Sequence, residues 1–174
     1  ILRKKGLATA EKKADRATSE GLIAILADEA RKAAVMVEVR CETDFCARNE
    51  EFRGMVQDLA KMAFAAPAGA VAATPAMADR LQATRAKIGE NMSYARGVKL
   101  SAPRVGHYRH HNGKVGVLVG IDGQIADETL ADLCMHIAFA NPMGVTRDDV
   151  PADLVAKERE IARQQALESG KPPQ

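Results

Sequence analysis

The residues most able to do chemistry in this 174-residue chain are its four histidines and three cysteines. His107, His110 and His111 lie close together, and the alternation of a strand would place His107 and His111 on one face. Such a pair could bind a metal ion, but no carboxylate or cysteine lies nearby in the sequence to complete a ligand set. Exposed histidines in a hairpin are the simpler interpretation, and we expect no metal.

Motifs for catalysis are missing from the sequence. It contains no glycine-rich phosphate loop, no GxSxG nucleophile elbow and no HExxH zinc motif. The cysteines are odd in number and form no CxxC pair, which favours reduced thiols in a reducing compartment such as the cytoplasm. No apolar run approaches the length needed to span a bilayer. We therefore expect a protein that is not an enzyme, binds no cofactor and does not enter a membrane.

The segment Thr43-Asp44-Phe45 is the strongest candidate for a binding site. Aromatic residues are scarce, with four Phe, two Tyr and no Trp, and Phe45 follows two residues of the types that cap helices. Phe45 could fold back onto the start of the next helix as a hydrophobic staple. It could instead protrude beside its acidic neighbour, as the aromatic anchors of protein interfaces do. The residues alone leave both interpretations open.

The elements that would position this segment begin with a hairpin. Strands are expected at 21–27 and 34–40, and the second alternates so that its valines share one face. A loop at 41–45 then leads into a helix with an apolar stripe of Phe52, Val56, Leu59 and Ala63. After an Ala/Pro/Gly-rich stretch, Thr74-Pro75 predicts the start of a helix that runs through Ile88 and ends at Gly89.

The second half of the chain has a similar pattern. We expect a strand at 92–101 and a hairpin of strands 104–111 and 114–121, turned at Asn112-Gly113. A helix then runs from Asp127 to Asn141-Pro142, and a last helix opens at 149–151 and is closed by Gly170. The first half carries about seven more residues than the second between strand and helix, and these include Thr43-Asp44-Phe45. An added loop of this kind is a common place for function.

Together these patterns predict an α+β fold of two similar subdomains, each an antiparallel sheet or hairpin packed with helices. Residues 1–20 would form a basic helical linker, 21–91 the N-terminal core subdomain, and 92–174 the C-terminal core subdomain with a final helix. The basic charge is concentrated in the first sixteen residues, and the whole chain carries a net charge of only +2. We expect no direct nucleic-acid partner.

The stretch from Thr43 to Phe52, TDFCARNEEF, resembles the signature segment of the elongation factor Ts family. Further segments agree with that family in order and spacing across the whole chain. They are Leu2-Arg3-Lys4-Lys5-Gly6, Lys87-Ile88-Gly89-Glu90-Asn91, Gly106-His107-Tyr108-Arg109-His110, Gly116-Val117-Leu118-Val119, Met135-His136-Ile137-Ala138 and Glu168-Ser169-Gly170-Lys171-Pro172.

The resemblance implies a guanine-nucleotide exchange factor that promotes GDP release from the GTPase elongation factor Tu during translation elongation. Asp44 and Phe45 would enter the GTPase beside its magnesium site, and Thr43 would belong to the same partner-binding segment. Ile88 and Gly89 would lie near its phosphate-binding region, and His110 would also touch it. A translation-associated adapter that binds protein or RNA without exchange activity is the alternative, and assembly of identical chains is left open.

The chain also departs from the family pattern. Because the first residue is Ile1, we expect a fragment or a processed product, without the small N-terminal helical module and the C-terminal end of the family. Cys46 stands where an aliphatic residue is common. His111 lies at a one-residue insertion that lengthens the hairpin turn, so the equivalence of His110 is less direct.

Overall fold

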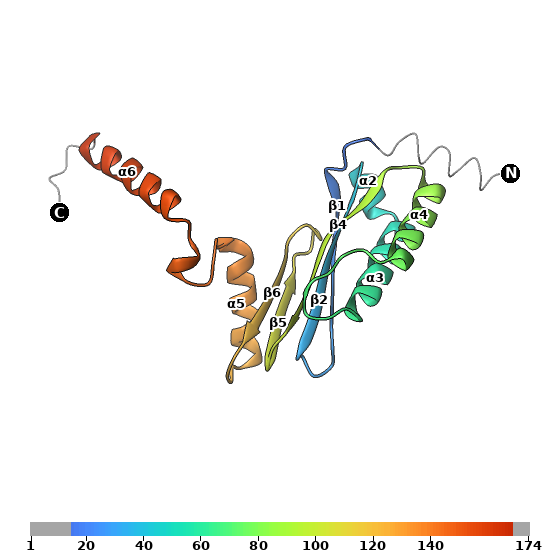
Figure 1. The fold of residues 1–174 in the computed structure, drawn as a ribbon, viewed down its shortest axis with the longest axis horizontal. Coiled ribbons are helices and arrows are strands. Elements are labelled where there is room, and N and C mark those ends of the chain that lie inside the picture. Colours follow the sequence, from blue (N-terminus) through green and yellow to red (C-terminus); the bar gives the residue numbers. More distant parts are fainter. Residues whose placement is uncertain (1–14, 169–174) are drawn as a thin grey trace. The chain divides into compact units, whose positions relative to one another are not determined.

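The computed structural model describes residues 15–168, so the basic segment at 1–14 and the expected helix end at Gly170 lie outside the described residues. Within this part, residues 15–139 and 140–168 form two compact units, and each is described by itself. Figure 1 shows the fold, an α+β arrangement of antiparallel strands and helices, which is the class predicted from the sequence.

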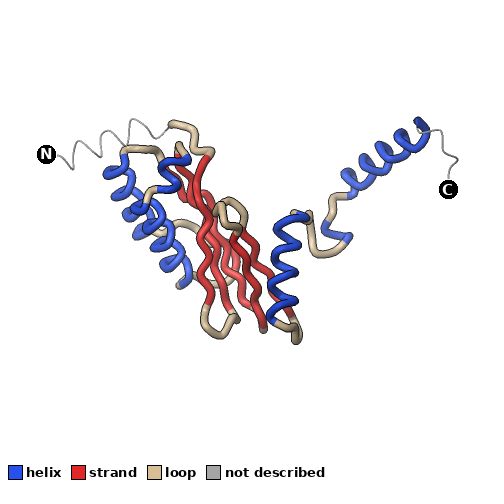
Figure 2. Tube along the Cα trace, turned by 180° about the vertical axis from the view of Figure 1, so that it is seen from behind, coloured by secondary structure: helices blue, strands red, loops and turns tan. Residues whose placement is uncertain are grey.

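The main sheet has four strands in the order β1-β2-β4-β3. Strands are drawn in red in Figure 2. β1 (Glu20–Ala27) and β2 (Ala33–Cys41) form the predicted hairpin, and β4 (Met92–Ser101) pairs antiparallel with the other edge of β2. A two-residue strand, β3 (Gly69–Ala70), pairs with β4 and was not predicted. The strand that opens the expected second subdomain thus belongs to the same sheet as the first hairpin.

Helices cover one face of this sheet. α3 (Glu50–Phe64) and α4 (Pro75–Ile88) pack there, and the short α2 (Asp44–Arg48) precedes them. The core is aliphatic with one aromatic ring, as the scarcity of aromatics requires: the alternating valines of β2 are fully buried, and so is the predicted stripe of α3. Its fully buried members include Val35, Val37, Val39, Phe52, Leu59 and Met55.

Both predicted ends of α4 are confirmed. The Thr74 hydroxyl accepts a hydrogen bond from the Met77 amide at 3.3 Å, and Pro75 occupies the first helical position. Gly89 ends the helix in the left-handed conformation at φ 78°, where a side chain would be strained, and its amide donates to the Arg85 carbonyl at 2.8 Å. These caps fix where the chain leaves α4.

The second hairpin is formed by β5 (Arg104–Arg109) and β6 (Gly116–Ile121), followed by α5 (Asp127–Ala140). The strands are shorter than predicted: the turn spans His110 to Gly113, so His111 lies in the loop rather than on the strand face with His107. The expected shared strand face for these two histidines is therefore wrong. The longer loop forms because the Gly113 amide donates to the His110 carbonyl at 2.8 Å and the Gly113 φ is 71°.

Glycines let this hairpin pack closely on both sides. A Cβ at Gly116 would lie 2.6 Å from Met36 Sδ on the main sheet, on the face opposite the buried valines. A Cβ at Gly106 would lie 2.6 Å from Leu130 Cδ1 of α5. The hairpin therefore lies between the main sheet and α5, which places the loop 110–115 beside β1.

The unit at 140–168 contains a 3-10 turn (Arg147–Asp149) and α6 (Ala152–Glu168). The Asp149 carboxylate accepts hydrogen bonds from the Val145 and Thr146 amides at 2.9 and 2.8 Å. These bonds, with the Thr146 hydroxyl, hold the pKa of Asp149 below its usual range. Within residues 15–168, no helix is long and apolar enough to cross a membrane.

Candidate protein-binding site

The expected loop at 41–45 is shorter than predicted, because Asp44 and Phe45 are the first two residues of helix α2. The Thr43 side chain caps this helix by accepting a hydrogen bond from the Cys46 amide at 3.1 Å. Asp44 lies in the first turn, where the helix dipole favours a negative charge, and forms an ion pair with Arg48 at 3.0 Å. Strong capping residues thus turn the predicted loop into a helical turn directly after β2.

Phe45 projects into solvent from this helix. Its side chain is 78% exposed, whereas Phe52, one element later, is completely buried. The hydrophobic-staple interpretation of Phe45 is therefore wrong, because the ring protrudes; its role as an interface anchor stays a prediction. An isolated exposed ring costs hydration free energy that burial against another surface would recover.

The opposite side of α2 is anchored in the core. Cys46 and Ala47 are buried, and Cys46 replaces the aliphatic residue that the family pattern favours without leaving the apolar cluster. The Cys41 thiol donates to the Thr43 carbonyl at 3.3 Å, directly beneath the cap. A hydrogen bond to Cys41 and burial raise the pKa of the Cys46 thiol, so it stays protonated. The helix that carries Phe45 is therefore held in place by its buried side, which packs in the core.

A carboxylate joins the two segments predicted to bind the partner. Glu90 accepts a hydrogen bond from the Thr43 hydroxyl at 2.9 Å and another from the Thr43 amide at 3.2 Å. Glu90 directly follows Gly89, and Ile88 packs partly buried against the core. The structure therefore brings Thr43-Asp44-Phe45 and Ile88-Gly89 together. Sequence reasoning missed the role of Glu90, although the residue lies in one of the recognised motifs.

A second set of bonds reinforces the same junction. The Asn91 amide donates to Glu42 Oε1 at 2.5 Å, and the Asn91 side chain donates to the Arg16 carbonyl at 2.7 Å. Arg85 of α4 in turn donates to Asn91 Oδ1 at 2.7 Å. The residues before Thr43 and after Gly89 are thus tied to each other and to α4, and the chain has little freedom at this end of the sheet.

His110 lies at the start of the β5–β6 loop, in different surroundings. Its Nδ1 atom is 2.9 Å from the Tyr108 hydroxyl. It lines an apolar hollow of about 330 Å³ together with Tyr108, Val115, Met135, Ala138 and Phe139. Its sequence neighbours, Arg109 at the end of β5 and His111 in the loop, line a different hollow together with Asp44. His110 and Asp44 therefore line separate hollows.

The histidines do not form a metal centre in the described part of the chain. Between residues 15 and 168, no group of three His, Cys, Asp or Glu side chains is placed to hold an ion. Burial and the nearby Arg31 guanidinium lower the pKa of His107, which keeps that ring neutral. The site therefore presents an exposed aromatic ring next to a carboxylate, a combination found in the anchors of protein interfaces.

Comparison with known proteins shows which family the chain is similar to. A family profile described as Elongation factor TS matches residues 42–174. Proteins named Elongation factor Ts are similar over nearly the whole chain: one from Hahella chejuensis is 44% identical over 98% of this chain, and one from Clostridium botulinum is 39% identical over 99%. The chain covers 60% and 61% of the length of these two relatives. The chain belongs to the elongation factor Ts family.

Proposed function

We propose that this chain promotes release of GDP from elongation factor Tu, as a guanine-nucleotide exchange factor of translation elongation in the cytoplasm. The proposal rests on family membership and on one observation: a phenylalanine that is 78% exposed stands on a helix whose other side is buried. An aromatic residue held in this way is suited to insert into a partner surface, because little side-chain and backbone freedom is lost on binding.

Exchange of this kind requires no covalent chemistry. A GTPase holds GDP through backbone amides at a helix N-terminus and through Mg²⁺ that bridges phosphate and protein oxygens. An exchange factor must bind the nucleotide-free form more tightly than the loaded form, and the coupling is reciprocal. Emptying an almost fully occupied site takes a difference of about 5 kcal/mol. Insertion of Phe45 would supply part of this difference in binding free energy. Asp44 would add to it by competing for positive groups near the phosphates.

The other residues predicted to contact the partner would lie around Phe45. Ile88 and Gly89 are tied to Thr43 through Glu90, so they would meet the same partner surface as Phe45. His110 would touch the partner from the β5–β6 loop. Packed interfaces have discrete arrangements, so a small displacement by the ring can be amplified into loss of Mg²⁺ coordination.

We also propose that residues 21–91 and 92–174 are related subdomains, with residues 92–101 shared through the main sheet. Each half contains a hairpin followed by a helix, β1–β2 before α3 and β5–β6 before α5. Between its hairpin and the following helix, the first half carries the additional helix α2, which holds Phe45. Independent superposition of the two halves in an experimental structure would test this relationship, and unrelated hairpin-to-helix connections would contradict it.

The function is tested by release of fluorescent GDP from elongation factor Tu as the concentration of this chain is raised. Phe45→Ala should lower the release rate at least tenfold, the loss expected when a central aromatic anchor is truncated. Its thermal stability should be unchanged, because the ring packs on nothing in the core. Leu167→Ala, which removes an exposed apolar side chain of α6, is the matched control and should release GDP normally.

The same assay distinguishes an exchange factor from the alternative, an adapter that binds without exchange activity. An adapter without exchange activity would bind elongation factor Tu, for example in a pull-down, and leave the GDP release rate at its spontaneous value. Full release by Phe45→Ala would show that another surface carries the activity.

A further inference from the structure

A hollow lies between α2 and the β5–β6 loop, and its lining includes Asp44, the residue before Phe45. Its volume is about 460 Å³, within the range of small-molecule sites. Its walls come from the start of β1, from α2 and α3, and from the end of β5 with the loop that follows it. Segments far apart in the sequence thus enclose one concave surface.

Cations predominate in the lining. Arg48, Arg53, Arg109 and Lys114 face two acids, Glu20 and Asp44, and His111 lies beside them. The acids are already used, since Glu20 accepts from Lys114 at 2.6 Å and Asp44 pairs with Arg48 at 3.0 Å. Among residues 15–168, neither Arg53 nor Arg109 has an acidic partner within ion-pair distance. Two guanidinium groups therefore line the hollow with unused hydrogen-bonding capacity.

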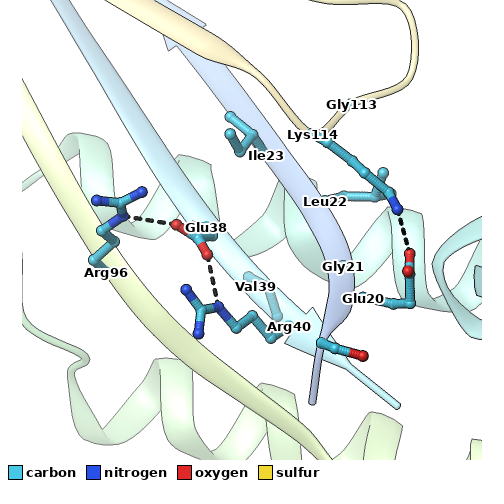
Figure 3. A pocket seen from close by; sticks show the side chains of 11 residues that line it. Glu20, Gly21, Leu22, Ile23, Glu38, Val39, Arg40, Arg96, Gly113 and Lys114 are labelled. Atoms are coloured by element: carbon cyan, nitrogen blue, oxygen red, sulfur yellow. Dashed lines mark hydrogen bonds and ion pairs between the residues drawn. The ribbon is translucent and has the colours of Figure 1, made fainter. Parts of the chain in front are cut away.

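A neighbouring hollow shows the contrast. It has a volume of about 350 Å³ and shares Lys114 and Glu20 with the first (Figure 3). There, Arg40 and Arg96 both donate to the Glu38 carboxylate at 2.7 Å, which lies between them in Figure 3. Both arginines of that hollow are hydrogen-bonded to a carboxylate within the protein, whereas Arg53 and Arg109 of the hollow beside α2 are not, within the part of the chain that the structure describes.

Arg109 is the last residue of β5, where it pairs with Gly116, and the loop that follows it is fixed in place. The Gly113 carbonyl accepts a hydrogen bond from the Ile23 amide of β1 at 2.7 Å, and the Asn112 side chain accepts from the Lys114 amide at 2.9 Å. A preorganised loop lowers the cost of ordering the cations around a ligand. The apolar lining is limited to Leu22 and Ala47, which leaves no pocket for the apolar anchor of a protein partner.

We propose that the hollow lined by Arg53 and Arg109 binds the phosphate groups of a small molecule, either free pyrophosphate or a nucleoside diphosphate. A guanidinium group presents its N–H donors in a fork that matches two phosphate oxygens, and two such groups match a diphosphate. Arg48 and Lys114 add positive potential at the rim, although each is partly compensated by its own acid. The site does not depend on the proposed exchange activity, because it lies wholly within this chain.

The test is calorimetric titration of the intact chain with pyrophosphate, with ionic strength held constant so that general screening cancels. Saturable binding is expected. Arg53→Gln and Arg109→Gln should each weaken it about tenfold, as loss of a charge-assisted contact predicts, and the double variant about a hundredfold. Arg147→Gln, which removes an exposed arginine from the 140–168 unit, is the charge-matched control and should bind as the unaltered chain does.

Parallel titrations with GDP and guanosine identify the source of the phosphate. Tighter binding of GDP than of pyrophosphate assigns the site to nucleotides, and the reverse order assigns it to free diphosphates; both support the proposal. Absence of saturable binding at millimolar pyrophosphate would overturn it. So would unaltered affinity in the double variant, an equal loss in Arg147→Gln, or guanosine binding as tight as GDP. Because elongation factor Tu is absent from these titrations, their failure would leave the exchange proposal untouched.

Discussion

Removal of the Glu90 carboxylate should weaken the fold and the proposed exchange activity together. Glu90 accepts two hydrogen bonds from Thr43, at 2.9 Å from the hydroxyl and 3.2 Å from the amide. Hydrogen bonds to a charged group contribute about 1.5–3 kcal/mol each when well buried. Glu90 is only partly buried, so solvent reduces the contribution, and we expect about 2 kcal/mol for the two bonds together.

The expected loss of stability depends on which residue replaces Glu90. Glu90→Ala should lower the free energy of unfolding in urea by about 2 kcal/mol, and Glu90→Gln, which keeps an acceptor but loses the charge, by about 1 kcal/mol. GDP release by Glu90→Ala should need a higher concentration of the chain, because α2 and Gly89 are no longer held in one arrangement. Glu29→Ala, an exposed glutamate in the β1–β2 turn, is the matched control and should change neither quantity.

A double-mutant cycle with Thr43→Val isolates the link itself. Thr43 also caps α2, a role that contributes about 1 kcal/mol without Glu90. Combining the two substitutions should therefore cost less than the sum of the separate effects. Additive losses, or a Glu90→Ala variant within about 0.5 kcal/mol of the unaltered chain, would refute the argument that this carboxylate holds the two segments together.

Three further outcomes follow from packing and charge. Phe52→Ala should lower the unfolding free energy by about 3–5 kcal/mol in urea denaturation, because its ring is completely buried. Gly106→Ala should lower the melting temperature, since the added methyl group would lie 2.6 Å from a Leu130 methyl carbon of α5. Burial opposes ionisation of Glu38, but Arg40 and Arg96 outweigh it and lower its pKa. Its contribution to stability is therefore present at neutral pH and lost as the pH falls through the lowered pKa; Glu38→Gln should unfold with a smaller pH dependence over that range.

The regular elements could be predicted from the sequence because their signals are local. Alternation in β2 and the stripe of α3 reflect the periods of a strand and a helix, and both faces are buried as expected. Thr74 and Gly89 mark the ends of α4 by chemistry that acts within a few residues. The register of the first hairpin follows from the same alternation, since a shift of one residue would expose the valines.

The contacts that build the site were harder to predict because they are distant in the sequence. Thr43 and Glu90 are 47 residues apart, and no pattern of either segment indicates that they meet. The pairing of β3 with β4 rests on two residues, too few for any periodicity to appear. Gly116 allows the second hairpin to approach Met36 closely, but a glycine in a strand is equally consistent with a bulge. The resemblance of the segment 43–52 is the basis of the proposed site, and the structure shows which contacts hold that segment in place.

The position of Phe45 favours a mechanism by displacement over one by simple attraction. A ring inserted into a partner shifts that partner only if the ring's own base resists movement more than the partner's loop does. Here the base is α2, with Cys46 and Ala47 in the main core and Thr43 joined to Glu90 across the sheet end. A ring on a flexible loop would itself move instead. The entropy cost of ordering that loop would then reduce the binding free energy. Under the proposed exchange function, the short helix after β2 would allow one exposed side chain to displace part of the GTPase.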